Sequence, residues 1–286
     1  RTPLRSRNYR PVARSAQNRL TQADVITPGT HLRLLLVFLS CLLPGLATAE
    51  LSETIQRIKP SILVVGTYKK TGSPQFSMRG TGFVVGDGNL VATNAHVVAD
   101  ITDPDIELVV RIGQGRSQGE SRLRRAKVMA SSKAHDLAVL RIDGAPFPAL
   151  KLANSDSVRE GQAIAFTGFP IGGALGFSPV THRGIVSSIT PIALPAGNAN
   201  QINDKLIRQI KSGTFDIFQL DATAYPGNSG SPVFDAASGE VIGVINMVFI
   251  KGSKEAALSQ PSGITYAIPA NYLAGLIERK SPQAPE

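Results

Sequence analysis

From about residue 60 onward, the sequence predicts an all-β fold, a barrel or a sandwich of antiparallel strands. Short apolar runs rich in Val, Ile and Phe alternate with Gly, Pro, Asn and Asp, which is the pattern of strands joined by turns. The stretch VVGDGNLV places Asp87 and Gly88 between two such runs, and this is a strong hairpin signal. Helical patterns occur only near the ends of the chain, which argues against a parallel α/β sheet.

The expected elements can be placed in chain order. Strands are expected at nine runs: SILVVGTYK (61–69), GTGFVVG (80–86), LVATNAHVV (90–98), IELVVRI (106–112), LAVLRI (137–142), AIAFTGF (163–169), GIVSSI (184–189), FDIFQLDA (215–222) and VIGVINMVFI (241–250). Helices are expected at LSETIQRIK (51–59) and PANYLAGLIERK (269–280). The strands occupy a region of more than 200 residues, so one large barrel or two small barrels are both possible.

Residues 1–49 are expected to be a basic leader and a signal peptide. Arg33 precedes the apolar stretch LLLVFLSCLLPGL, which is shorter than the ~20 residues needed to span a bilayer. Ala47 and Ala49 then occupy the positions of an A-x-A cleavage site. We therefore expect export to the periplasm or out of the cell, a mature chain that begins at Glu50, and only transient contact with the membrane.

Alternatives to simple cleavage stay open for this leader. The apolar stretch could be retained as an anchor or could be a buried helix. Cys41, the only cysteine, lies in FLSC, which faintly resembles a lipoprotein signal. Lipidation is ranked below cleavage because Phe38 fits that signal poorly. A mature chain without cysteine would hold together without disulfides, which its size permits.

The net charge of +9 is concentrated in the leader. Residues 1–49 hold seven Arg and one acidic residue and so contribute +6. The remaining 237 residues carry 23 Lys or Arg against 20 Asp or Glu, which is +3. No basic run with interleaved aromatic residues is present in the sequence, so nucleic-acid binding is not expected. The sequence leads us to expect no cofactor and no metal.

Ser229 lies in DATAYPGNSGSPVFD (221–235), where small and turn-forming residues surround it. Most such clusters are surface turns, and a serine hydroxyl is unreactive until a base takes its proton. His96 closes TNAHVV at an expected strand end, and Asp136 heads the apolar run of HDLAVLRI. Each residue alone has an ordinary structural explanation. Together, in the order His, Asp, Ser and each at a strand edge, they favour a catalytic triad.

Four separated motifs carry a family resemblance. GTGFVVGDGNLVATNAHVV, HDLAVLRI, LANSDSVREGQAIAFTGFP and FQLDATAYPGNSGSPVF resemble, in order, the blocks of the Deg/HtrA branch of the trypsin-like serine proteases. The resemblance runs from Ile58 to Ile268. It implies two antiparallel six-stranded β-barrels of the chymotrypsin type, with the active cleft between them and a short C-terminal helix. The expected domains are the leader (1–49), a barrel carrying His and Asp (50–150), a barrel carrying Ser (151–268), and a helix with a tail (269–286).

The resemblance also implies roles. Ser229 would be the nucleophile, His96 its general base, and Asp136 the group that orients His96. The N–H groups of Gly227 and Ser229 would form the oxyanion hole, and Gly227 would permit the backbone turn that aims them. His135 and His182 are expected to do no chemistry. His182 could line the cleft, but a plain surface role is preferred for it.

The same resemblance suggests a specificity pocket. Its base, six residues before the nucleophile, would be Thr223, so no buried acid is available for a Lys or Arg side chain. Ile245 takes the place where proteases that cut after Glu commonly carry a histidine. Asn246 and Val248 would offer backbone groups to an extended substrate, which docks by β-augmentation, and Tyr266 would add bulk. We expect polypeptide substrates cut after small or medium aliphatic residues.

Three departures from the family pattern are informative. Asn228 replaces the Asp of digestive relatives, so activation by a cut N-terminus is not expected. Ser231 replaces the commoner Gly and is small enough to be a mild change. The chain ends six residues after Lys280, so we expect no peptide-binding PDZ domain. An oligomer is possible. The rival hypothesis is a catalytically silent binding protein or chaperone, although no triad member is substituted.

Overall fold

The computed structural model of the chain describes residues 51–112, 123–173, 176–191, 215–246 and 263–279. The expected leader, its cleavage site, Cys41 and Val248 lie outside these residues, so the expectations for them remain predictions. No helix among the described residues is long and apolar enough to cross a membrane.

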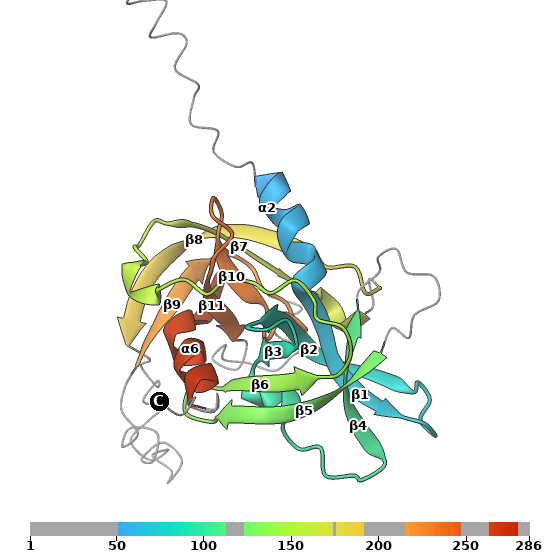
Figure 1. The fold of residues 1–286 in the computed structure, drawn as a ribbon. Helices are drawn as coiled ribbons and strands as arrows, with labels where there is room; N and C mark the ends of the chain where they lie inside the picture. Colours follow the sequence, from blue (N-terminus) through green and yellow to red (C-terminus); the bar gives the residue numbers. More distant parts are fainter. Residues whose placement is uncertain (1–50, 113–122, 174–175, 192–214, 247–262, 280–286) are drawn as a thin grey trace, which may run out of the picture. The chain divides into compact units, whose positions relative to one another are not determined.

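The first six strands close into one antiparallel barrel (Figure 1). Its strands are β1 (Ile62–Lys69), β2 (Phe76–Val85), β3 (Leu90–Thr93), β4 (Ile106–Ile112), β5 (Leu123–Ser132) and β6 (Leu137–Ile142), in the order β1-β2-β3-β6-β5-β4. The barrel interior is filled by buried aliphatic side chains such as Leu63, Val84 and Leu140. The predicted hairpin joins β2 to β3, and Gly88 adopts a φ of 88° in its turn, where glycine carries no steric penalty.

The second barrel repeats this architecture. Its strands are β7 (Ala163–Gly168), β8 (Val180–Pro191), β9 (Asp216–Asp221), β10 (Pro232–Asp235), β11 (Val241–Asn246) and β12 (Ile264–Pro269), in the order β10-β11-β12-β9-β8-β7. Phe166, Phe218 and Ile245 are fully or almost fully buried in its interior. The prediction of two six-stranded antiparallel barrels is therefore confirmed.

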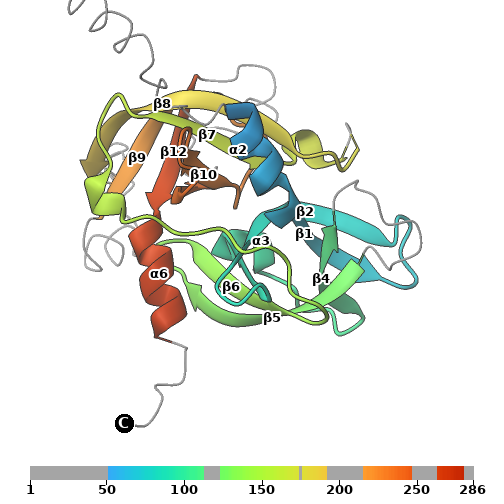
Figure 2. The ribbon, with the colours of Figure 1, turned by 45° about the horizontal axis from the view of Figure 1, so that its top comes forward.

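A shared apolar cluster and the two helices join the barrels. Phe83 of the first barrel and Phe234 of the second belong to one buried cluster, together with Leu273 of α6 (Ala270–Glu278). Figure 2 shows α6 leaving β12 and running beside β5 and β6 of the other barrel. The short helix α2 (Leu51–Ile58) packs on the turn between β10 and β11. Burial of this common face holds the two barrels in one arrangement.

The helix α2 docks through both apolar and polar contacts. Ile58 is 1% exposed and belongs to the shared cluster. The guanidinium of Arg57 donates from Nη2 to the Ser238 carbonyl at 2.9 Å.

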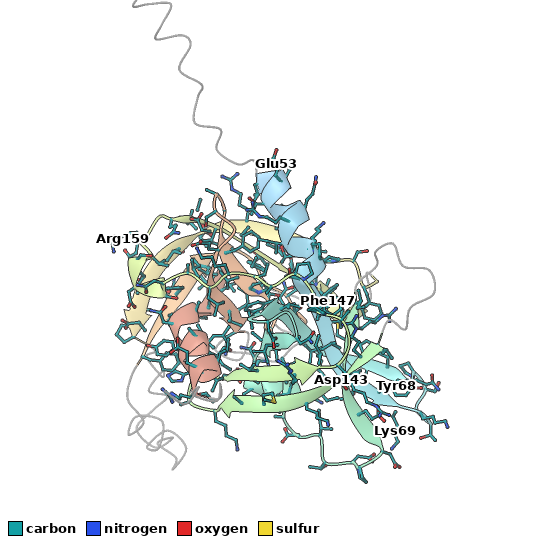
Figure 3. All side chains as sticks on the ribbon, in the orientation of Figure 1. Glu53, Tyr68, Lys69, Asp143, Phe147 and Arg159 are labelled. Atoms are coloured by element: carbon teal, nitrogen blue, oxygen red, sulfur yellow. The ribbon has the colours of Figure 1, made fainter. Side chains whose placement is uncertain are left out.

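Figure 3 shows charged side chains such as Glu53 and Arg159 at the outer edge of the molecule, as the cost of burying an unpaired charge requires.

Three strands were not predicted as strands, and each has a physical reason. β5 carries Arg and Lys and exposes Val128 and Met129, so it lacks the apolar run of a buried strand. β10 has only four residues and follows the Gly-rich segment directly. β12 begins with exposed Ile264 and ends at Pro269, so its apolar run is short, and the segment was considered only for the bulk of Tyr266. In a fourth difference, the run 90–98 is a strand only to Thr93, after which the chain turns into a helix.

Candidate active site

His96 and Asp136 form a close pair at one end of the first barrel. His96 lies in α3 (Ala95–Val98), a single helical turn after β3, and not at a strand end as predicted. Its Nδ1 lies 2.6 Å from Oδ2 of Asp136, and its backbone N–H donates to Oδ1 at 2.8 Å. An ionised carboxylate only accepts hydrogen bonds. In a neutral His96 ring the proton therefore lies on Nδ1, and Nε2 keeps the lone pair that a general base needs.

The turn before β6 fixes the position of Asp136. The residue adopts a φ of 49°, a left-handed conformation that Asp tolerates better than most residues. Its carbonyl accepts from the N–H of Ala95 at 3.1 Å and from Nδ2 of Asn94 at 3.0 Å. Asn94 precedes α3 with an extended backbone, which begins the helical turn. The motifs TNAH and HD are thus joined by hydrogen bonds on both the backbone and the side chain of Asp136.

Asn246 supplies a contact that the sequence did not predict. Its side chain is fully buried at the end of β11, and Nδ2 donates to Oδ2 of Asp136 at 2.8 Å. The sequence suggested a role for Asn246 only through its backbone. The hydrogen bond crosses from the second barrel to the first, and it gives Oδ2 a second donor beside the His96 ring.

Replacing Asn246 with Leu, which has a similar volume, is expected to lower kcat about 10-fold with little change in KM. A hydrogen bond to a charged group contributes roughly 1.5–3 kcal/mol, and its loss leaves the carboxylate of Asp136 held by His96 alone. Steady-state kinetics with a peptide substrate measures this. A kcat within twofold of the native value would show that Asn246 does not support Asp136.

The segment before Ser229 forms a tight turn. Asn228 N–H donates to the Tyr225 carbonyl at 2.9 Å, and Gly227 has a φ of 103°. Proline at the second position and a positive φ at the third are the features of a type II turn. The Pro226 carbonyl accepts from Ile171 N–H at 2.6 Å. Since N–H and C=O of a trans peptide point in opposite directions, the Gly227 N–H points away from Ile171.

The next free N–H belongs to Ser229. The carbonyl of the same peptide unit, that of Asn228, accepts from Ser231 N–H at 2.9 Å. Within the part of the chain that the structure describes, neither Gly227 N–H nor Ser229 N–H donates a hydrogen bond. Two backbone donors beside a serine hydroxyl can bind an oxyanion. Hydrogen bonds hold the carbonyls of the same two peptide units, so the donors need not reorganise when an oxyanion forms.

Glycines allow the two barrels to approach each other at Ser229. A Cβ on Gly80 of β2 would lie 2.9 Å from the Ser229 carbonyl and 2.8 Å from the side chain of Val97, the neighbour of His96. The Ser229 backbone and α3 therefore both lie close to the same face of Gly80. Among the described residues, no hydrogen bond joins the His96 ring to the Ser229 hydroxyl. Such bonds are often long in an enzyme without substrate and tighten when substrate binds.

The two substituted family positions are both buried. Asn228 is 0% exposed, and within the described ranges neither its Nδ2 nor its Oδ1 has a hydrogen-bond partner. The hydroxyl of Ser231 is likewise buried without a partner there. A Cβ on Gly168 would contact both, at 2.0 Å from Ser231 Oγ and 2.9 Å from Asn228 Oδ1. Both side chains therefore pack against the end of β7, next to Ser229 in the sequence.

The expected pocket residues are only partly brought to a common surface. Thr223 and Tyr266 are partly exposed, on the segment after β9 and on β12. Ile245 is 0% exposed and its side chain belongs to the core of the second barrel. Asn246 pairs with Tyr266 across β11 and β12, whereas Val248 lies outside the described residues. Their roles in specificity remain predictions.

His182 is not the plain surface residue that we expected. Its ring stacks on Phe166 with centroids 4.8 Å apart and lies 6.0 Å from the Tyr225 ring. Burial lowers the pKa of His182. The alternation of strand β8 places it on the inward side opposite Phe166, with which it is in register.

His135, next to Asp136, packs on the C-terminal helix. Its ring stacks on Tyr272 at 4.4 Å and meets the edge of Phe215 at 4.8 Å, and Ser132 Oγ lies 3.0 Å from its Nδ1. Burial, and to a lesser degree the positive charge of Arg279, lowers the pKa of His135. The neutral ring is thus the form that the fold favours.

The lowered pKa of His135 predicts acid sensitivity. Above the unfolded value of ~6.5 the ring is neutral in both states, and its stabilising effect is fully present. As the pH falls through ~6.5, the unfolded state binds a proton first, so the free energy of unfolding falls. Replacing His135 with Phe should make the loss of stability between pH 8 and pH 5 smaller. Urea unfolding at both pH values tests this, and an unchanged loss would contradict it.

A family model described as a trypsin-like peptidase domain matches residues 80–244. A probable periplasmic serine endoprotease, DegP-like, of Pseudomonas fluorescens is 32% identical over 190 residues, which are 66% of this chain and 32% of that protein. The mitochondrial serine protease HTRA2 of Drosophila pseudoobscura pseudoobscura is 30% identical over 209 residues, 73% of this chain and 40% of that protein.

Solved structures give a consistent result. The HtrA-type protease AlgW with tripeptide has a TM-score of 0.56 and 26% identity, over 80% of this chain and 62% of that one. The same protease with decapeptide has a TM-score of 0.57 and 25% identity, over 81% and 69% of the two chains. The chain thus spans about a third to two fifths of the length of the two curated relatives.

Proposed function

The chain belongs to the Deg/HtrA branch of the trypsin-like serine proteases, and from this membership we propose that it is an exported serine endopeptidase that cuts unfolded or extended polypeptide segments. One observation carries the proposal. Two backbone N–H groups, at Gly227 and Ser229, have no partner among the described residues, and the Ser229 backbone lies against Gly80, which also faces Val97, the neighbour of His96.

The proposed reaction proceeds through an acyl-enzyme. Ser229 Oγ attacks the scissile carbonyl carbon while its proton moves to His96 Nε2. The carbonyl oxygen becomes an oxyanion and accepts hydrogen bonds from Gly227 N–H and Ser229 N–H. The C–N bond then breaks as His96 gives the proton to the leaving amine. Water repeats the sequence on the ester, which releases the new carboxyl group and restores the Ser229 hydroxyl.

Asp136 acts in this scheme through His96. It holds the ring with the proton on Nδ1, and its negative charge stabilises the imidazolium that forms after proton transfer. The two contacts to His96, at the ring and at the backbone, fix both the position and the rotation of the imidazole. Asn246 limits the movement of Asp136 from the other side.

Polypeptides are the proposed substrates. The AlgW structures contain a tripeptide and a decapeptide, which supports this class for a related protease. Thr223 at the proposed pocket base offers no charge, and Tyr266 narrows the opening. An unpaired Lys or Glu side chain buried there would cost several kcal/mol. Cleavage is therefore proposed to follow Val, Ala, Ile or Leu.

A peptide-library cleavage profile tests the function and the specificity together. The purified chain should cut after small or medium aliphatic residues, and the Ser229→Ala variant should cut nothing in the same library. Cleavage mainly after Arg, Lys or Glu would contradict the pocket assignment. Equal cleavage by the Ser229→Ala variant would contradict the protease assignment itself.

Export from the cytoplasm is part of the proposal. It rests on the basic leader, the short apolar stretch and the small residues before Glu50, and on relatives described as periplasmic. Other relatives are described as mitochondrial. N-terminal sequencing of the exported protein should give Glu50 as the first residue, whereas a start before Cys41 or lipid on that cysteine would contradict the cleavage site.

A further inference from the structure

Thr81 of β2 contacts the nucleophile turn of the other barrel with both its backbone and its side chain. The residue is 0% exposed. Its N–H donates to the Ser229 carbonyl at 2.9 Å. Its hydroxyl donates to the Gly227 carbonyl at 2.8 Å and accepts from Phe169 N–H at 3.1 Å. One side chain of the first barrel thus joins the turn before Ser229 to the end of β7.

The hydroxyl completes the restraint of one peptide unit. The unit between Gly227 and Asn228 is held at its N–H by the Tyr225 carbonyl and at its carbonyl by Thr81 Oγ1. Rotation of this unit would break both bonds and would change the ψ of Gly227 and the φ of Asn228. The unit lies between the two peptide units that carry the proposed oxyanion donors, Gly227 N–H and Ser229 N–H, so the angle between those donors depends on Thr81.

Thr81 itself has little freedom to move. Thr93 Oγ1 donates to its carbonyl at 2.7 Å. A Cβ on Gly230 would lie 2.1 Å from that carbonyl, and one on Gly168 would lie 3.0 Å from Thr81 Oγ1. The strand and the turn are packed as closely as glycine backbones allow, so a displaced turn cannot be accommodated by a small shift of β2.

We propose that Thr81 is a positioning residue for catalysis, whose hydroxyl holds the oxyanion-hole turn in its productive conformation. The inference rests on the proposed function, since it assigns Thr81 to the same site. The Thr81 hydroxyl is expected to affect kcat and not KM, because the oxyanion is absent from the bound substrate and develops only on the way to the transition state. A misplacement of about 1 Å can cost 10²-fold in rate, and removing one oxyanion donor costs about 10²–10³-fold in kcat.

The test compares three variants of the full chain. Thr81→Val keeps the shape and removes the hydroxyl, whereas Thr81→Ser keeps the hydroxyl. Ser155→Ala is the matched control, because the Ser155 hydroxyl is also buried, donates to the Ile242 carbonyl at 2.9 Å and accepts from Asn271 N–H at 3.2 Å. Ser155 contacts no part of the nucleophile turn in these hydrogen bonds.

We expect Thr81→Val to lower kcat by roughly 10- to 100-fold with KM within about threefold of the native value. Thr81→Ser and Ser155→Ala should keep kcat within about threefold. Hydrogen exchange should become faster across 225–231 in Thr81→Val only. The inference is overturned if Thr81→Val keeps native kcat and native exchange, or if Ser155→Ala loses as much kcat as Thr81→Val.

Two further outcomes are also decisive. If Thr81→Val does not fold, Thr81→Cys takes its place, because a thiol has the size of serine's side chain but donates and accepts weakly. Its kcat must then fall about 10-fold below that of Thr81→Ser, and equal values overturn the inference. If the native chain hydrolyses no peptide, the proposed function fails, and hydrogen exchange alone decides whether Thr81 holds the turn.

Discussion

Replacing either Ser229 or His96 with Ala is expected to lower kcat by about 10⁶-fold, the loss seen when a member of such a triad is removed. Without Ser229 no acyl-enzyme forms, and without His96 no group takes the serine proton. Steady-state kinetics on a peptide cleaved by the native chain measures both losses. Circular dichroism should show an unchanged fold, since Ser229 donates no side-chain hydrogen bond among the described residues.

The double variant is the sharper control for this prediction. Residues that act as one unit do not contribute additively. The combined Ser229→Ala and His96→Ala change should therefore cost little more than the worse single change. Losses that multiply in the double variant would mean that the two residues act independently, and the triad assignment would be wrong.

Replacing Asp136 with Asn is expected to lower kcat by about 10⁴-fold, with KM little changed. In this structure the carboxylate accepts three hydrogen bonds, from the backbone and ring of His96 and from Asn246. An amide must turn its NH₂ group toward at least one of these donors. If the amide donates to the His96 ring, the ring proton moves to Nε2, and the base can no longer accept the serine proton.

The check on Asp136→Asn is its kcat, measured at a pH where the native chain is fully active. The tautomer argument requires the loss to appear in kcat at that pH. A variant within 10-fold of native kcat would show that Asp136 does not set the tautomer of His96. An unfolded variant can be recognised by circular dichroism, and Asp136→Glu then tests the same position with a carboxylate retained.

The main features of the fold could be predicted because they depend on local hydrophobic patterns in the sequence. Apolar runs of 61–69, 106–112 and 137–142 became β1, β4 and β6 with boundaries that differ by one residue at most. β5 was not predicted because its apolar residues do not mark its buried face. Val128 and Met129 are exposed, and charged residues interrupt the strand, so the sequence shows neither an apolar run nor a regular alternation. Hydrophobic patterns in the sequence arise from burial, so a largely exposed strand produces only a weak pattern.

The candidate site shows the same limit more clearly. His96, Asp136 and Ser229 lie in motifs whose combination and order in the sequence suggest their chemistry. Asn246 reaches Asp136 across 110 positions of sequence, and Thr81 reaches Gly227 across 146. The hydrophobic periodicity of the sequence cannot predict such contacts, because they depend on how the two barrels pack against each other. Asn and Thr are also common in strands and turns, so their identity raises no expectation of a role.

The central claim is that Ser229 is a nucleophile activated by His96, and labelling with a fluorophosphonate tests it most directly. The probe reacts only with an activated hydroxyl, forming an Oγ–P bond and releasing fluoride. Mass spectrometry of the full chain should place one label on Ser229, with labelling lost in His96→Ala and strongly slowed in Asp136→Asn. A native chain that hydrolyses no peptide and takes no label, or a label that persists in His96→Ala, would contradict the account.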